Sequence, residues 1–391
     1  MPTAAPLTNP VLADTWESIG LFQPFDGGIS KNNAKAHAGR YVMTWGSSEP
    51  LAWRSGNDTI SEGFYLPFDT DADPSDFGRL GHPLSWWQSK HPDWVLYRCD
   101  RSSPAWVNGL RNNVPLDISN PAVVAYQMRV AVPFMQANGY TSLAVDVLAL
   151  VNGPGGCGVW TQNHTVWVEK FSGQSQDPQW AAAVISWLSY TQWYLHAQEP
   201  QLPMLVNSPG WVTQGDPGEE SLIAHLDGFQ DEAGFTGWGN HLVNEAAFLN
   251  KIWWAAYIQG QGKAYLVTDL WQRAEPDPIQ RDFAVATYLM GKAHQAAMAT
   301  SQYGNYGVEH YWPEFASSVG APCGPMSKTQ GAYLRQYTGA LVIVNPTGAT
   351  VDVTLPRSVH SYKDIEGRGV TSPLPVLQDD GYVLMTHNGC G

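Results

Sequence analysis

The stretch Ser142-Leu-Ala-Val-Asp146 decides how the rest of this chain is interpreted. Three apolar residues in a row that end in a carboxylate are typical of a short, buried strand with a polar carboxyl end. The segments on either side, 121–138 and 177–197, open with Asn-Pro and Asp-Pro. Each pair is an N-cap followed by proline at the first helical position. The order therefore predicts helix, strand and helix, one unit of a parallel α/β architecture.

The same alternation of short apolar strands and amphipathic stretches runs from about residue 40 to 312. Eight strands are expected, at residues 40–45, 63–68, 94–97, 142–146, 204–207, 228–232, 264–268 and 306–309. Further helices are expected at 242–260 and 277–300, the second again opened by Asp-Pro. Eight strands with intervening helices in about 270 residues predict a (β/α)8 TIM barrel. The rival is a doubly wound sheet, but no Gly-rich phosphate turn follows an early strand.

The pattern of apolar and polar residues changes after about residue 330. Residues 340–346, 349–355 and 381–385 alternate in the manner of strands, with turn residues between them and no helical period. We therefore expect a catalytic barrel over residues 1–330 and a small C-terminal antiparallel β-sandwich domain over 331–391.

The composition excludes two classes of partner. The chain has 35 acidic and 21 basic residues, a formal net charge of −14 at pH 7, and no basic run. Nucleic-acid binding needs clustered Lys and Arg, so we expect no nucleic-acid partner. No stretch approaches 18 consecutive apolar residues, so we expect no membrane span. The opening six residues have no basic n-region and no apolar h-region, so no signal peptide is expected within this sequence.

Four cysteines allow three pairings if all are bridged. Cys99 and Cys157 follow neighbouring expected strands, and a Cys323–Cys390 bridge would then tie the C-terminal tail to the barrel. The alternative is four buried free thiols. Bridged cysteines and the acidic balance favour a secreted, extracellular protein.

Acids and amides stand where the expected strands end. They are Asp69 and Asp71, Asp100, Asp146, Asn207, Asp231 and Glu232, Asp269, and Glu309 with His310. Each alone is also explained as a helix cap or turn former. Together they would form a polar ring at the carboxyl end of the barrel, where TIM-barrel active sites lie. Such a ring suits a polyhydroxylated ligand.

Cleavage of a glycosidic bond requires two carboxyl groups, one to protonate the leaving oxygen and one to act as nucleophile or to activate water. Asp146 ends a buried strand. Glu232 precedes the small residues of Ala233-Gly-Phe235, which leave room for a substrate. Because successive strand residues point to opposite sides, only one of Asp231 and Glu232 faces the barrel axis. We favour Glu232 and keep Asp231 as the alternative.

Five segments together resemble a group of hypothetical glycosyl hydrolases within the α-galactosidase-like superfamily of barrels. They are His91-Pro-Asp-Trp-Val-Leu-Tyr-Arg-Cys-Asp100, Pro115-Leu-Asp-Ile-Ser-Asn-Pro-Ala122, Asn138-Gly-Tyr140, Ala144-Val-Asp146 and Asp227-Gly-Phe-Gln-Asp-Glu-Ala-Gly-Phe235. The resemblance spans roughly residues 40–390. It implies a nucleophilic Asp that closes strand four and an Asp or Glu acid/base that closes strand six. It also implies α-linked substrates and retention of configuration. Strand four continues as Val-Asp-Val-Leu-Ala, without the Cys or Asn often found after the nucleophile of true α-galactosidases.

Other side chains are candidates for holding a sugar. Tyr97, Arg98 and Asp100 would precede Asp146 by one strand, the alternative being a structural ion pair. Further candidates are Asn207, Asp269, Arg273 and Glu309. For eight tryptophans in or near strand-end loops, the alternatives are stacking on a sugar ring and packing in the core: Trp45, Trp86, Trp87, Trp160, Trp211, Trp238, Trp271 and Trp312. Of these, Trp45, Trp238 and Trp271 are placed in the substrate-binding set.

No metal or cofactor is expected, because the histidines lack ligand spacing. No Gly-x-Ser-x-Gly elbow indicates a hydrolase of the esterase kind. The sequence thus predicts a glycoside hydrolase that acts on an oligo- or polysaccharide. The alternatives are a non-catalytic carbohydrate-binding barrel, and an inverting glycosidase, lyase or transglycosylase on the same scaffold. The sequence does not indicate an oligomeric state.

Overall fold

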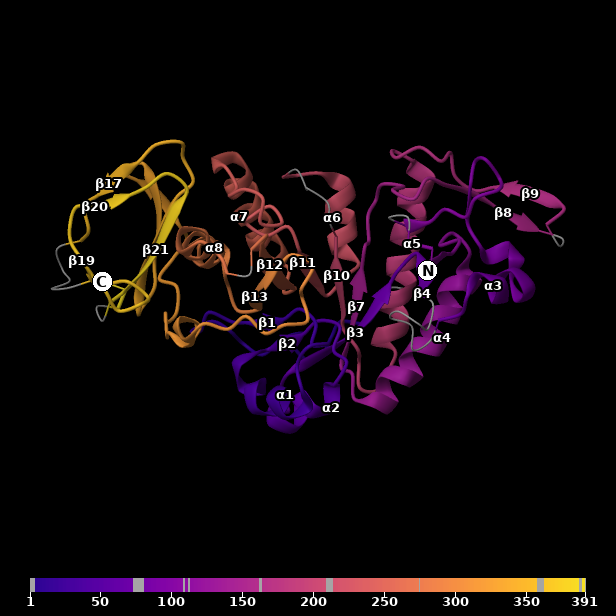
Figure 1. The fold of residues 1–391 in the computed structure, drawn as a ribbon, viewed down its shortest axis with the longest axis horizontal. Helices are drawn as coiled ribbons and strands as arrows, with labels where there is room; N and C mark the ends of the chain where they lie inside the picture. The colour runs from indigo at the N-terminus through magenta and orange to yellow at the C-terminus, as the bar shows by residue number, and fades with distance from the viewer. Residues whose placement is uncertain are drawn as a thin grey trace. The chain divides into compact units, whose positions relative to one another are not determined.

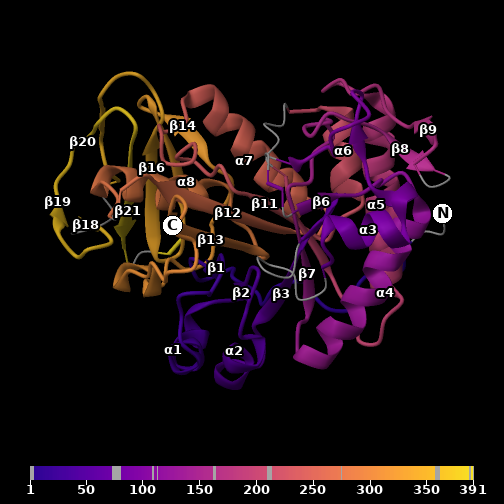
Figure 2. The same cartoon turned by 45° about the vertical axis from the view of Figure 1, so that its right-hand side comes forward.

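The computed structural model describes residues 4–72, 81–107, 110–111, 113–161, 164–208, 214–273, 275–356, 362–386 and 389–390. Its main element is an eight-stranded sheet with the order β1-β2-β3-β7-β10-β11-β12-β13. The strands are β1 (Phe22–Gln23), β2 (Met43–Thr44), β3 (Ser61–Pro67), β7 (Ser142–Asp146), β10 (Met204–Asn207), β11 (Gly228–Asp231), β12 (Ala264–Trp271) and β13 (Ala296–Gln302). A parallel bridge between Leu21 and Met298 joins the two ends of this order, where β1 lies beside β13 (Figures 1 and 2). The predicted (β/α)8 barrel is confirmed.

The chain divides into two compact units. Unit 1 comprises Met1–Asn9, Phe64–Trp211 and Gly215–Asp227, and unit 2 comprises Pro10–Gly63, Val212–Gln214 and Gly228–Gly391. The predicted boundary between residues 330 and 331 stays a prediction.

Unit 1 holds the strands β7 and β10, whose register pairs Leu143 with Met204 and Val145 with Val206. Its helices are α3 (Leu84–Lys90), α4 (Pro121–Asn138), α5 (Pro178–His196) and α6 (Pro217–Ala224), with the short helix η2 (Pro92–Trp94). A three-stranded antiparallel sheet consists of β5 (Tyr97–Arg98), β8 (Gly156–Thr161) and β9 (Val166–Glu169), and a two-stranded one of β4 (Thr70–Ala72) and β6 (Asn113–Pro115).

The helix predictions in unit 1 are confirmed, and the structure shows why they succeed. The Asn120 side chain accepts a hydrogen bond from Ala122 N at 3.0 Å, and Asp177 accepts one from Gln179 N at 2.9 Å. Each cap satisfies an amide that the helix itself cannot. At the other end of α4, Gly139 takes a φ of 84°, which a side chain would disfavour, and so ends the helix.

Unit 2 holds β1, β2, β11, β12 and β13 with α1 (Lys31–His37), α2 (Pro50–Gly56), α7 (Glu245–Gly260) and α8 (Pro278–Gly291). Short helices η1 (Ala38–Arg40) and η4 (Pro313–Ala316) belong to the same unit. Strand β12 is buried along all eight of its residues, as expected for a central parallel strand covered on both faces.

The C-terminal part of unit 2 is an antiparallel β domain, as predicted. Six strands pair in the order β14 (Ser327–Thr329), β15 (Ala332–Gln336), β16 (Ala340–Asn345), β21 (Asp380–Met385), β18 (Tyr362–Lys363) and β19 (Gly369–Val370). A second pair, β17 (Val351–Val353) and β20 (Leu374–Val376), packs Val353 and Val376 against Leu341 and Leu384 of the larger sheet. The apolar residues between the two sheets form the sandwich core.

Two of the predicted barrel strands are wrong. Residues 94–97 fall in η2 and at the start of β5, which pairs with β8 outside the barrel, and residues 306–309 form turns. The barrel instead begins at β1 and closes with β13, which starts within the predicted helix 277–300 and runs beyond its end. That helix ends at Gly291. One false early strand replaced the missed β1, so the ordinal numbers of the fourth to seventh strands remain correct.

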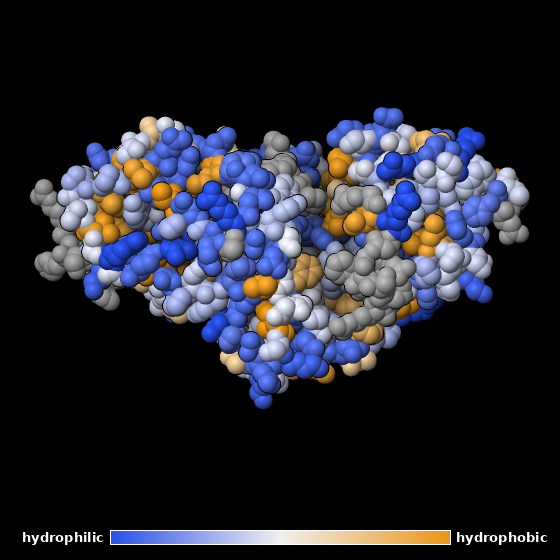
Figure 3. Space-filling model, in the orientation of Figure 1, coloured by the Kyte–Doolittle hydropathy of each residue, from blue (hydrophilic) through white to orange (hydrophobic). Residues whose placement is uncertain are grey.

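Both predicted disulfides are present, Cys99–Cys157 in unit 1 and Cys323–Cys390 in unit 2. Among the described residues, no helix is both long and apolar enough to cross a membrane. On the face drawn in Figure 3, hydrophilic residues predominate and hydrophobic ones appear in separate patches.

Candidate active site

Asp146 is the last residue of β7, the fourth strand of the barrel, and its side chain is partly exposed. Three donors fix its carboxylate. Tyr65 Oη donates to Oδ2 at 2.6 Å, Asn207 Nδ2 donates to Oδ1 at 2.7 Å, and Val147 N donates to Oδ1 at 2.8 Å. Tyr65 comes from β3 and Asn207 from the end of β10, so the strands on both sides of β7 orient the same group.

The residue after Asp146 is held in an unusual backbone conformation. Val147 has a φ of 59°, in the left-handed region that a β-branched side chain strongly disfavours. It is the only β-branched residue with a positive φ among the described residues. Strain of this kind costs about 1–3 kcal/mol and concentrates at functional sites. The turn presents the Val147 amide to the carboxylate of Asp146.

A second carboxyl group lies near Asp146 in unit 1. Asp69, two residues after β3, is 3% exposed, and its Oδ1 has no hydrogen-bond partner within the described residues. Burial raises the pKa of Asp69 to about 7; a hydrogen bond from its own backbone amide lowers that pKa, and the negative charge of Asp146 adds to the rise. Asp69 therefore holds a proton over much of the acidic range, which limits repulsion between the two carboxyl groups.

In unit 2, Asp231 closes β11 and forms an ion pair with Lys251 of α7. The two side chains are 14% and 9% exposed. The helices of a TIM barrel lie outside the strands, so a partner on α7 places the Asp231 carboxylate on the outer side of β11. Alternation along the strand then directs Gln230 to the opposite side, and Glu232 begins the turn after β11. Gln230 donates to Thr268 Oγ1 of β12 at 3.0 Å, on that opposite side.

Asp269 is also on the Asp231 side of the sheet and is fully buried. Its Oδ1 accepts a hydrogen bond from Phe235 N at 2.6 Å, and Gly234 has no side chain that would meet this carboxyl group. Asp269 therefore anchors the loop that follows β11. Burial raises its pKa to about 7, against the lowering effect of the Phe235 amide.

The other side chains predicted for the site are dispersed. Tyr97, Arg98 and Asp100 lie on or beside β5, outside the barrel. Tyr97 accepts a hydrogen bond from Gln88 at 3.0 Å, and Asp100 accepts from the amides of the two serines at 102 and 103, both at 2.8 Å. The structure does not place these three residues at the end of a barrel strand.

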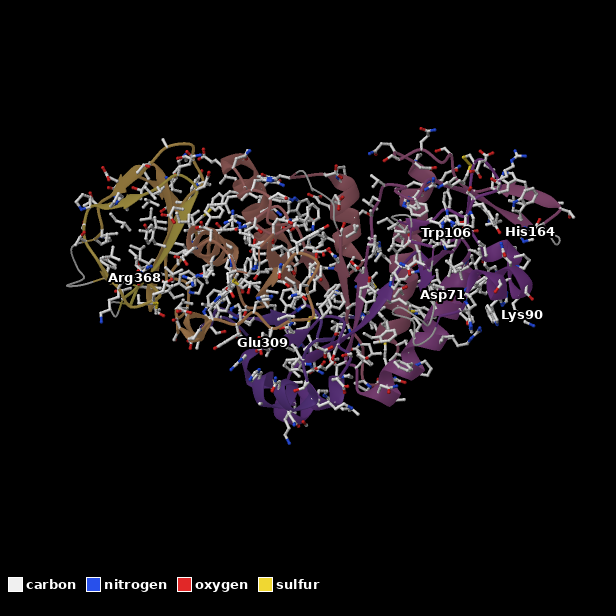
Figure 4. All side chains as sticks on the ribbon, in the orientation of Figure 1. Asp71, Lys90, Trp106, His164, Glu309 and Arg368 are labelled. Atoms are coloured by element: carbon white, nitrogen blue, oxygen red, sulfur yellow. A yellow bond between two sulfur atoms is a disulfide. The ribbon has the colours of Figure 1, made fainter. Side chains whose placement is uncertain are left out.

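Glu309 lies in the segment after β13, in unit 2 (Figure 4). Its carboxylate accepts hydrogen bonds from Arg40 at 2.8 Å and Tyr41 at 2.7 Å, and His37 Nδ1 lies 2.6 Å away. Three partners leave this carboxylate little capacity for a sugar hydroxyl, and they attach the segment to α1 and η1. Arg273, by contrast, is exposed two residues after β12.

The tryptophans separate into two groups by burial. Trp45, Trp87 and Trp271 are at most 1% exposed and pack in the core. The partly exposed ones are Trp86, Trp160, Trp238 and Trp312, and Trp211 lies outside the described residues. Trp238 follows β11 with a φ of 56°, held by Gln272, whose side chain donates to its carbonyl at 2.6 Å.

Three residues of these sites are not indicated by the sequence: Tyr65, Val147 and Lys251. The first lies inside a strand where aromatic residues normally signal core packing, and the third on a helix face whose contacts depend on the tertiary fold. The signal for Val147 is only its position after a strand-end acid. Among the described residues, no group of three His, Cys, Asp or Glu side chains is placed to hold a metal ion.

No family model and no curated protein sequence matches this chain. Solved structures do align with it over most of its length. An α-amylase from Anoxybacillus aligns with a TM-score of 0.49 at 11% identity and covers 95% of this chain and 97% of its own. The α-amylase AmyB from Thermotoga neapolitana gives 0.49 at 11%, covering 94% and 98%. A family 36 α-galactosidase from Geobacillus stearothermophilus gives 0.46 at 11%, covering 95% and 56%. All three are glycoside hydrolases.

Proposed function

We propose that this protein is a glycoside hydrolase with Asp146 as its nucleophile. The observation that carries the proposal is the carboxylate of Asp146 at the carboxyl end of β7, oriented by Tyr65 and Asn207 beside the strained Val147. Residues at the carboxyl ends of barrel strands perform the chemistry in TIM-barrel enzymes. A carboxylate fixed on both oxygens is pre-organised for attack and loses little conformational freedom in reacting.

We propose Glu232 as the acid/base. The pairing of Asp231 with Lys251 on α7 supports this choice, because it engages Asp231 on the outer side of β11. Glu232 begins the turn that follows the same strand and is partly exposed. Asp231 is retained as the alternative that mutation must exclude.

The reaction would run in two steps with retention of configuration. Asp146 attacks the anomeric carbon as the glycosidic bond breaks, and Glu232 gives its proton to the leaving oxygen. Water then attacks the same carbon from the side vacated by the leaving group. Glu232 takes the proton of this water, and the ester to Asp146 breaks to release the sugar.

The substrate class is an oligo- or polysaccharide. The sequence resemblance to α-galactosidase-like barrels supports an α-linked sugar. Asn207 remains a proposed binding residue because it donates to Asp146. Trp238 and Arg273 also remain proposed binding residues, because the first is partly exposed and the second exposed. The two disulfide bonds support an extracellular location.

The first test is Asp146→Asn, assayed with nitrophenyl α- and β-glycosides and with soluble polysaccharides. We expect the wild-type protein to hydrolyse at least one α-linked substrate and the variant to lose about a thousandfold or more in kcat, with its melting temperature little changed. Asp93→Asn in η2 is the matched control and should retain full activity.

Retention of more than a few per cent of activity by Asp146→Asn would show that another group is the nucleophile. If the wild-type protein binds sugars and hydrolyses none of them, it is a carbohydrate-binding barrel instead. The anomeric form of the first product, read by NMR, separates retention from inversion.

A further inference from the structure

The β11 loop, residues 233–239, is wound tightly against β12, and both lie within unit 2. Phe235 N donates to Asp269 Oδ1 at 2.6 Å. The hydroxyl group of Thr236 donates to Leu270 O at 2.8 Å and accepts from Leu270 N at 3.1 Å. These three bonds satisfy buried polar groups of the loop and attach it to the end of β12.

Two glycines allow the β11 loop to lie this close to the strand. A Cβ at Gly234 would come 2.5 Å from Asp269 Oδ1, and a Cβ at Gly239 would come 2.4 Å from Trp271 Cα. Both glycines also take a positive φ, of 54° and 79°. Side chains at these two positions would push the loop away from β12, so its own sequence fixes its place.

Trp238 is held in an unfavourable backbone conformation within this loop. Its φ is 56°, and among the described non-glycine residues with a positive φ it has the largest side chain. A bulky residue in this region costs about 1–3 kcal/mol, and such strain concentrates at functional sites. Gln272 Nε2 donates to the Trp238 carbonyl at 2.6 Å, which secures the conformation. Residues 233–237 are buried and Trp238 is partly exposed, so the loop displays this indole in a fixed position.

The β11 loop also returns Trp238 to the neighbourhood of Glu232. The Trp238 amide donates to Ala233 O at 3.2 Å, and Ala233 directly follows Glu232 in the chain. An acid that protonates a glycosidic oxygen must come within about 2.6–3.2 Å of that oxygen. The group that departs with the oxygen therefore lies beside the residues around the acid. An indole ring suits the apolar C–H face of a pyranose.

We propose that Trp238 determines specificity for the leaving group, by stacking on the sugar unit that departs from the glycosidic bond. This role rests on the proposed function, with Glu232 as the acid/base. It makes the preferred substrate an oligosaccharide with a pyranose on the leaving side, rather than a glycoside of a small alcohol. Because the loop is fixed before the substrate binds, stacking requires no further ordering of the backbone.

Three substrates with the same glycone test this role: a glycosyl fluoride, a dinitrophenyl glycoside and an oligosaccharide. The variant is Trp238→Gly, because glycine accepts a positive φ without strain and the loop keeps its backbone. We expect kcat/KM to fall about tenfold for the oligosaccharide and for the dinitrophenyl glycoside, whose leaving groups both carry a ring. For the fluoride it should stay within about twofold of wild type, since the leaving atom is too small to contact an indole.

Two further variants are measured beside it. Trp238→Phe keeps an aromatic face and should recover most of the loss on the two ring-bearing substrates. Trp253→Ala, which removes a partly exposed indole from α7, is the matched control and should behave as the wild type does on all three substrates.

A loss confined to the oligosaccharide would show that the variant has displaced Glu232, since only this leaving group needs strong acid assistance, and would overturn the stacking role. Equal losses on all three substrates, or no loss at all, would overturn it as well. Each of these results leaves the proposed function standing, because the wild-type protein turns over its substrate. A wild-type protein that hydrolyses none of the three refutes the proposed function and the role of Trp238 together.

Discussion

Asp231 and Glu232 are neighbours in the chain with different surroundings. The first is engaged by the ammonium group of Lys251 with both side chains nearly buried, and the second is partly exposed in the turn that follows the strand. Strand periodicity alone predicts that one of Asp231 and Glu232 faces the barrel axis. It does not indicate which of the two does so, and both therefore stood as candidates for the acid/base. The Lys251 partner on α7, twenty positions away in the chain, shows that Asp231 is engaged in an ion pair.

Mutations separate the two roles. Asp231→Asn leaves Lys251 with a buried charge, so we expect a loss of about 3–5 kcal/mol in the free energy of unfolding, measured by chemical denaturation. Glu232→Gln should leave stability within about 0.5 kcal/mol of wild type and lower kcat at least about a hundredfold on substrates with poor leaving groups. A fully active Glu232→Gln protein would show that another residue is the acid/base.

The double variant Asp231→Leu with Lys251→Met removes both charges of the buried pair. It should recover much of the unfolding free energy that Asp231→Asn loses.

Asp269 makes stability depend on pH in a defined direction. Burial raises its pKa from an ordinary 3.8 to about 7 in the folded protein. Between these values the folded state holds a proton that the unfolded state has lost. Stability from this group is therefore complete below about pH 4 and falls as the pH rises towards 7, by up to about 1.4 kcal/mol per pH unit.

The variant Asp269→Asn removes this contribution while keeping an acceptor for the Phe235 amide. The unfolding free energy should be measured at several pH values between 4 and 7. Its slope against pH should be less negative for the variant than for the wild type, by about the 1.4 kcal/mol per pH unit that one bound proton contributes. Parallel curves for the two proteins would show that Asp269 is ionised in the fold.

At the scale of elements, the turn after β7 links backbone strain to the candidate nucleophile. Val147→Gly relieves the positive φ, which offsets the entropy cost of glycine, so its unfolding free energy should change by about 1 kcal/mol or less. Val145→Gly, within β7 and fully buried, should lose about 3 kcal/mol or more. We expect kcat of Val147→Gly to fall about tenfold, since a flexible turn no longer fixes the amide that orients Asp146. Unchanged kcat would make the strain incidental.

Sequence patterns predicted those elements whose signal is local. The helices α4 and α5 were predicted because each begins with an Asn or Asp N-cap followed directly by proline, a signal contained in two adjacent residues. Strand β1 has only two residues, too few to show alternation, and it is defined by pairing with β2, next to the Leu21–Met298 bridge. Strand β13 begins Ala-Ala-Met-Ala, which has high helix propensity, and only its place beside β12 makes it extended.

At the scale of the whole molecule, each compact unit is assembled from separated segments of chain. The change from unit 2 to unit 1 falls within β3, between Gly63 and Phe64. No composition shift marks such a point, so a sequence cannot indicate it. Each disulfide joins residues of one unit, Cys99 with Cys157 and Cys323 with Cys390. The crosslinks therefore stabilise the units separately.

The barrel as a whole is proposed to form a covalent glycosyl intermediate on one carboxylate. The most direct test uses a fluorinated glycosyl fluoride of the preferred sugar, which forms the intermediate but slows its hydrolysis, followed by mass mapping of the digested protein. We expect a single added sugar on the peptide that contains Asp146, and none on Asp146→Asn. An adduct on a different carboxylate, or no adduct together with an inverted product, would contradict it.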